Sequence, residues 1–203
     1  MRGPIAAAVL LIDRILRKRH GIREFTTDPD CVLRVAVGRA DREIRLSDGT
    51  KLESGDPVGE IHLWNERIPK MRRRGPDITW GLGFQRSLVK SLRLLADYVR
   101  ASPEFDDVKA FRARPGVKGR DGEAKVARLA QRFGFEMPAT TGTPSLLERL
   151  YRFFDNLYAT GLMLTFNPVS LKGREFWCFS RPEIWISRKG LLERYGNSQN
   201  WQC

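Results

Sequence analysis

The sequence predicts a single domain of the α+β class, with an antiparallel sheet, several packed helices and an amphipathic helix at the N-terminus. Three observations support this class. Strand-like alternation concentrates between residues 31 and 66, whereas helical spacing dominates from residue 80 onward. The order of helices and strands is too mixed for a clean series of βαβ units. The 203 residues are also enough to bury a core without disulfide or metal staples.

Residues 1–21 are predicted to form an amphipathic helix that precedes an α+β domain over residues 22–203. Pro4 suits a first helical turn, Arg17–Arg19 suit a last turn, and Gly21 suits the stop. The apolar run is far shorter than the roughly 20 residues that span a bilayer. The helix therefore either packs on its own domain or lies in a membrane interface, with its basic end on anionic head groups. Its apolar stripe consists of Ile5, Ala8, Val9, Ile12, Ile15 and Leu16.

The first half of the domain is predicted to be an antiparallel meander of three or four strands. The strands are expected at residues 31–39, 42–46 and 58–66, with a short one at Lys51–Leu52. Asp48-Gly49 between them is typical of a tight hairpin, because this pair tolerates the positive φ angles that such turns require.

The second half is predicted to be mainly helical, after an exposed, proline-flanked loop at residues 67–77. Helices are expected at Trp80–Ala101, at residues 123–133 and 146–161, and at Lys189–Tyr195. Short strands are expected at Asp106–Arg112, Leu162–Phe166, Glu175–Phe179 and Glu183–Ser187.

The charge balance is the largest compositional signal. Thirty-six Lys and Arg residues against 24 Asp and Glu residues give a formal net charge of +12. Such an excess favours a polyanionic partner, either an anionic membrane surface or a nucleic acid. Two histidines exclude a His-rich metal site, so no metal is expected. The three cysteines form no CxxC pair, which favours a reducing compartment over a disulfide framework.

Two segments carry a resemblance to a known family. The segment LSDGTKLESGDPVGEIHLWNERI, at residues 46–68, resembles the YkoP-like domains of bacteria, and PEIWISRKGLLERYG, at residues 182–196, is similar to the close of the same family. The resemblance covers most of the chain beyond residue 8. YkoP-like domains occur alone and fused to polysaccharide deacetylase modules, which implies a cell-envelope context. The resemblance implies no activity and no catalytic residues, and nothing here resembles the Asp-plus-two-His metal site of a deacetylase.

The predicted strand at residues 58–66 contains the first candidate ligand site. Alternation of side chains places His62, Trp64 and Glu66 on one face. These residues can line a ligand cleft in which His62 acts as an acid or base near neutral pH. The alternative is a hydrogen-bonded sheet histidine beside a core Trp64. Glu66 and Arg67 are the stronger candidates, because loops carry sites more often than strands do. No residue is assigned a catalytic role.

Two basic loops are candidate sites for an anion or phosphate. The segment Arg114–Gly119, RPGVKG, resembles the pyrophosphate loop of acyl-CoA N-acetyltransferases, Arg/Gln-x-x-Gly-x-Gly/Ala, but the first glycine comes one place early and the helix starts late. The run Arg72–Arg74, between Trp64 and Trp80, can anchor the protein at a membrane interface. In both loops the alternative is a solvated charge run without a ligand. The candidates are Arg72, Arg73, Arg74, Arg114, Gly116, Lys118, Gly119 and Arg120.

Three functions remain open from the sequence. The first is a cytoplasmic, envelope-associated domain, peripheral at the inner face of the membrane, that recognises a lipid-linked or polyanionic glycan intermediate. The second is an N-acetyltransferase-like transferase, which alone requires acyl-CoA as a cofactor. The third is a nucleic-acid-binding protein, which ranks last because no RNP-like or helix-turn-helix pattern is present.

Overall fold

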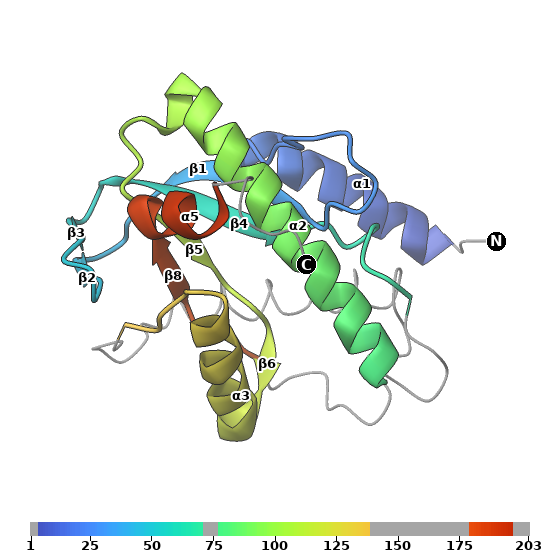
Figure 1. The fold of residues 1–203 in the computed structure, drawn as a ribbon. Helices are drawn as coiled ribbons and strands as arrows, with labels where there is room; N and C mark the ends of the chain where they lie inside the picture. Colours follow the sequence, from blue (N-terminus) through green and yellow to red (C-terminus); the bar gives the residue numbers. More distant parts are fainter. Residues whose placement is uncertain (1–3, 71–76, 139–178, 197–203) are drawn as a thin grey trace, which may run out of the picture.

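A four-stranded sheet forms the centre of the protein (Figure 1). The structure is a computed structural model that describes residues 4–70, 77–138 and 179–196. The strands follow the order β1-β4-β5-β8, in which β1 pairs antiparallel with β4, β4 parallel with β5, and β5 antiparallel with β8. Their bounds are β1 Leu33–Arg39, β4 Pro57–Leu63, β5 Ala110–Ala113 and β8 Ile184–Ser187.

The predicted α+β class is confirmed, and the sheet is mixed instead of fully antiparallel. A parallel pair needs a crossover connection, which the long helix α2 (Ile78–Ala101) and the short 3-10 turn η1 (Pro103–Phe105) supply between β4 and β5. The expected meander also differs in one respect. Among the described residues, strands β2 (Ile44–Arg45) and β3 (Lys51–Leu52) pair only with each other, as a separate two-stranded hairpin.

The described helices and strands β5 and β8 agree with the sequence prediction except at their ends, whereas η1 and the short strand at Val117–Lys118 were not predicted. Helix α1 covers Pro4–Arg19 and α5 covers Arg188–Tyr195. Helix α2 begins two residues before the predicted start, because the Asp77 carboxylate caps it by accepting from the Trp80 N–H at 2.7 Å. The helix predicted at residues 146–161 and the strand at residues 162–166 lie outside the described residues. Strand β6 (Val117–Lys118) pairs with β7 (Phe179–Ser180), and helix α3 covers Gly119–Arg132.

The main core lies between one face of the sheet and helices α2 and α5. The apolar stripe of α2 buries Leu92, Leu95 and Val99, and α5 adds Leu191 and Tyr195. The sheet meets them with alternate residues of its strands, which is the two-residue period of a half-buried sheet. These residues are Leu33, Val35, Ile61, Phe111 and Ile186. A smaller apolar cluster lies under the β2–β3 hairpin, where Leu52 and Ile44 pack with Val58 and Trp185.

Gly59 allows the parallel strands β4 and β5 to pack closely. A Cβ atom at this position would lie 2.1 Å from the ring of Phe111, which is fully buried opposite it. No real Cβ atom comes so close to a ring, so a side chain here would displace Phe111 from the core.

Gly59→Ala is therefore expected to lower the free energy of unfolding by about 1–3 kcal/mol, the usual cost of overpacking a core. Urea denaturation measures this change. Gly83→Ala is the matched control, because a Cβ there meets no atom within 4 Å and the residue lies inside α2. It should raise stability by about 0.5–1 kcal/mol. Equal effects from the two substitutions would contradict the close packing of β4 on β5.

Candidate functional site

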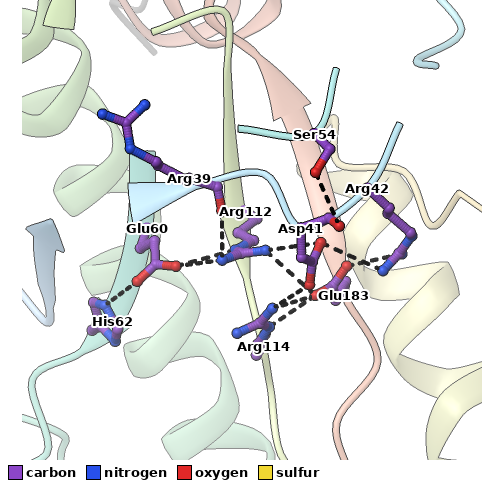
Figure 2. A network of polar contacts seen from close by, with 9 residues as sticks. All are labelled: Arg39, Asp41, Arg42, Ser54, Glu60, His62, Arg112, Arg114 and Glu183. Carbon is purple, nitrogen blue, oxygen red and sulfur yellow. Dashed lines mark hydrogen bonds and ion pairs between the residues drawn. The ribbon is translucent and has the colours of Figure 1, made fainter. Parts of the chain in front are cut away.

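The face of the sheet opposite α2 carries a network of charged side chains (Figure 2). Strand register creates its centre, because Glu60 and Arg112 alternate with the core positions of β4 and β5. Glu60 of β4 lies beside Arg112 of β5. His62, two residues further along β4, lies opposite Arg34 of β1. The same alternation that predicts the core therefore gathers polar groups on one surface.

Arg112 is the centre of the network. Arg112 is only 6% exposed, so its guanidinium needs partners within the protein. Its Nη2 and Nε donate to Glu60 Oε1 at 2.6 and 3.2 Å. Its Nη1 lies 3.5 Å from Asp41 Oδ1 and 3.7 Å from Glu183 Oε1. One buried cation thus faces three carboxylates from three different parts of the chain.

Two further arginines complete the charge balance. Arg114 donates to Glu183 Oε1 from both Nη2 and Nε, at 2.6 and 2.9 Å. Arg42 Nη2 lies 2.9 Å from the other oxygen of Glu183. Burial alone would raise the pKa of Glu183, but Arg114, Arg42 and Arg112 together lower it. The three carboxylates of Asp41, Glu60 and Glu183 therefore face three guanidinium groups, and the network is close to neutral.

His62 lies at the edge of this network and is half-buried. Its Nε2 lies 3.7 Å from Glu60 Oε2. Burial alone would raise the pKa of Glu60. The neighbouring His62 ring and the guanidinium of Arg112 outweigh this effect and lower the pKa of Glu60 to about 2. Glu60 is therefore an anion at any physiological pH. It can orient His62 and pair with Arg112, but it cannot donate a proton.

Gly38 of β1 makes room for the Glu60 carboxylate. A Cβ atom on Gly38 would lie 2.7 Å from Glu60 Cδ and Oε1. Sequence reasoning missed Glu60, Arg112, Asp41 and Glu183 altogether. The sequence does contain a signal for Glu60, because it lies two residues before His62 on the same strand and therefore faces the same side of the sheet.

The predicted cleft of His62, Trp64 and Glu66 is not one face of a strand. Strand β4 ends at Leu63, because the chain turns there and the Arg67 N–H donates to the Trp64 carbonyl at 2.9 Å. Trp64 is 5% exposed. Its indole ring contacts two guanidinium groups, that of Arg67 at 3.4 Å and that of Arg34 at 4.4 Å from the ring centroid.

Glu66 belongs to a second ion-pair group around Arg34. The buried Arg34 guanidinium lies 3.3 Å from Glu66 Oε2 and 3.0 Å from Glu24 Oε1. Arg67 donates to the Asp28 carbonyl. Trp64, Glu66 and Arg67 are thus engaged in contacts within the protein, whereas the side chain of His62 stays partly exposed. Their binding of a ligand stays a prediction.

The phosphate-loop candidates do not lie on one continuous loop. Arg114 is bound to Glu183, and Gly116 is the last residue before β6. Lys118 ends β6, and Gly119 and Arg120 begin α3, four residues earlier than predicted. The side chains of Lys118 and Arg120, and all of Arg72–Arg74, lie outside the described part of the protein.

Helix α1 shows a second candidate surface. Leu11 and Ile15, one helical turn apart, are 58% and 57% exposed. Asp13 on another side of the helix is buried and pairs with Arg17 Nε at 2.7 Å. Of the predicted apolar stripe, Ile15 is exposed and Leu16 is half-buried, and the other side chains lie outside the description. Among the described helices, none is long and apolar enough to cross a membrane.

No group of three or more His, Cys, Asp or Glu side chains among the described residues has the geometry to hold a metal ion. The charged network consists of carboxylates already paired with arginines, which leaves few free oxygen ligands for a hard cation.

The family of this protein follows from a comparison with family models. The YkoP domain matches residues 3–195, nearly the whole chain, and the chain belongs to this family. The resemblance carried by residues 46–68 and 182–196 is thereby confirmed. Neither a curated protein nor a solved structure matches the chain.

Glu60→Gln is expected to lower the free energy of unfolding at pH 7 by on the order of 3 kcal/mol, because the wild-type carboxylate has a pKa well below its unfolded value. The depressed pKa stabilises the fold fully above pH 4.5, and this stabilisation is lost as the pH falls toward about 2. The deficit of the variant should therefore shrink over that range. Urea unfolding at pH 7 and pH 3 measures it.

Glu53→Gln is the control for this series. Glu53 is exposed and pairs only with Lys51 in the described structure, at 3.3 Å, so its substitution should change stability by less than about 0.5 kcal/mol at either pH. A Glu60→Gln deficit that is equally small, or that stays constant with pH, would show that the network does not hold Glu60 ionised.

Proposed function

We propose that this protein is a peripheral membrane domain that binds anionic bilayers through α1. The observation that carries the proposal is the exposure of Leu11 and Ile15 on one side of that helix. Single exposed apolar residues are ordinary on protein surfaces, but two large ones a turn apart on an amphipathic helix form a contact suited to the acyl boundary of a bilayer.

Charge around this pair supports an anionic surface as the partner. Arg14, Lys18 and Arg19 are exposed on the same helix. Asp13, the acidic residue of α1, turns into the protein and pairs with Arg17, so the outer side of the helix is basic. Each basic residue near an anionic leaflet contributes about 1 kcal/mol to binding. The formal net charge of +12 acts in the same direction at long range.

The ligand class that we propose is a lipid-linked or polyanionic glycan intermediate of the cell envelope. Its support is membership of the YkoP family together with the envelope context that the family implies. We further propose the inner, cytoplasmic face of the membrane, because three scattered cysteines suit a reducing compartment.

No described contact favours the acyl-CoA-dependent transferase or the nucleic-acid-binding protein. The transferase hypothesis needs Arg114 free for a pyrophosphate, whereas this residue donates twice to Glu183. The nucleic-acid hypothesis still rests on net charge alone.

Replacing both Leu11 and Ile15 by Ser is expected to weaken binding to vesicles of phosphatidylglycerol and phosphatidylcholine by about tenfold or more, since each apolar side chain loses its transfer into the interface. Co-sedimentation of the full chain with these vesicles measures it. Pure phosphatidylcholine vesicles should bind the wild-type chain far more weakly, because they lack the negative surface charge.

Leu129→Ser is the matched control, because Leu129 is a similarly exposed leucine on α3. It should leave vesicle binding unchanged. Absence of vesicle binding by the wild-type chain, or equal binding by the wild type and the α1 variant, would refute the proposal. Both sets of side chains are largely exposed, so unfolding does not explain a selective loss.

A further inference from the structure

A shallow groove joins the two segments that carry the family resemblance. It has a volume of about 460 Å³ and lies between the β2–β3 hairpin, the residues that precede β5, and the start of α5. In Figure 1 the hairpin and α5 lie far from the N-terminal end of α1. The polar groups that line it include Thr50, Lys51, Asp106, Lys109, Arg188 and Lys189.

The hairpin turn lies beside the N-cap of α5 and is bonded to the segment that follows α3. The hydroxyl of Ser187, the N-cap of α5, lowers the pKa of the Asp48 carboxyl in the hairpin turn. On the far side of the hairpin, the Ser47 N–H and hydroxyl donate to the Glu136 carboxylate. The hairpin turn, the segment after α3 and the start of α5 therefore lie close together beside the groove.

The residues that line the groove are mainly basic, and each of the cations has a carboxylate within 4.0 Å. Of its described lining residues, four are cations and only Asp106 is an anion. The ion pairs of these cations are loose or exposed. Arg188 Nη2 lies 3.5 Å from Asp106 Oδ1, and Lys189 Nζ lies 4.0 Å from Glu193 Oε1. Lys51 and Lys109 pair with Glu53 and Asp56 at the outer rim, at 3.3 and 3.0 Å. Such solvated pairs add little net free energy, so a ligand with two or more negative charges can replace them.

Arg188 supplies the guanidinium of the groove, and its side chain is 30% exposed. Its Nε is buried and makes no hydrogen bond with any residue that the structure describes. The α5 backbone begins at this residue, so the positive end of the helix dipole adds to the side-chain charges. Arginine binds phosphate oxygens in pairs through its planar fork, whereas lysine contributes point charges.

We infer that this groove binds the phosphate or diphosphate group of a small molecule. Three lysines and one arginine supply the charge, Thr50 supplies a neutral hydroxyl, and the open shape leaves room for the rest of the molecule outside. The inference goes beyond the proposed function and does not depend on α1. The phosphate group can belong to a soluble ester or to a lipid-linked one.

Titration calorimetry of the full chain with inorganic pyrophosphate at low salt tests this inference. The wild-type chain should bind saturably. The double variant Lys109→Gln, Lys189→Gln should bind at least tenfold more weakly, because both side chains are exposed cations of the groove. Lys125→Gln, Arg128→Gln is the matched control, since it removes the same charge from exposed positions on α3 and should bind as the wild type does.

Absence of saturable pyrophosphate binding, or equal weakening by the groove and control variants, would overturn the inference, since the latter result reflects net charge alone. The source of the phosphate is distinguished in the Leu11→Ser, Ile15→Ser chain, which lacks the α1 contact. If that chain binds phosphatidic acid vesicles, and if the added substitutions Lys109→Gln and Lys189→Gln abolish this binding, the phosphate belongs to a lipid. Binding of pyrophosphate alone identifies a soluble one. If vesicle binding through α1 fails while pyrophosphate binding persists, only the proposed function is wrong.

Discussion

The pairing of Glu60 with Arg112 across the parallel strands β4 and β5 is the contact on which the rest of the structure depends. A buried guanidinium is costly unless carboxylates compensate it, and Arg112 has Glu60 at 2.6 Å with Asp41 and Glu183 close by. The same register that brings Glu60 beside Arg112 places Phe111 against Gly59 on the other face. One alignment of two strands therefore fixes both the core and the charged surface.

This arrangement divides the roles of the charged residues. Arg112 on β5, with Arg42 and Arg114 beside the sheet, pairs with carboxylates of β4, of Glu183 just before β8 and of the chain after β1. These arginines therefore stabilise the fold and leave little net charge there. The cations that we propose for binding a partner lie away from this network, around Leu11 and Ile15 on α1 and in the groove beside α5. A membrane surface and a phosphate-bearing ligand can in this way be bound at separate places without disturbing the sheet.

Much of the fold was predictable, because local patterns determine it. The spacing of Leu92, Leu95 and Val99 predicts α2, and alternation predicts β1 and β4. The parallel pairing of β4 with β5 could not be predicted from the sequence, because no local pattern in either strand specifies a partner strand about 50 residues away. The site was predicted less well for the same reason. The chemistry of histidine alone favours His62 as a site residue, but its neighbours Glu60 and Arg112 can be identified only when the strand register is known. Trp64 was assigned to a ligand cleft and lies against Arg34 and Arg67.

A double-mutant cycle between Glu60 and Arg112, followed by urea unfolding at pH 7, tests this dependence most directly. Glu60→Gln, Arg112→Met and the double variant remove each charge alone and then both. We expect a coupling free energy of at least about 1 kcal/mol, because either single variant leaves a buried charge without its partner while the double variant does not. Effects that add within about 0.5 kcal/mol would show that the two residues act independently and that the fold does not rest on their pairing.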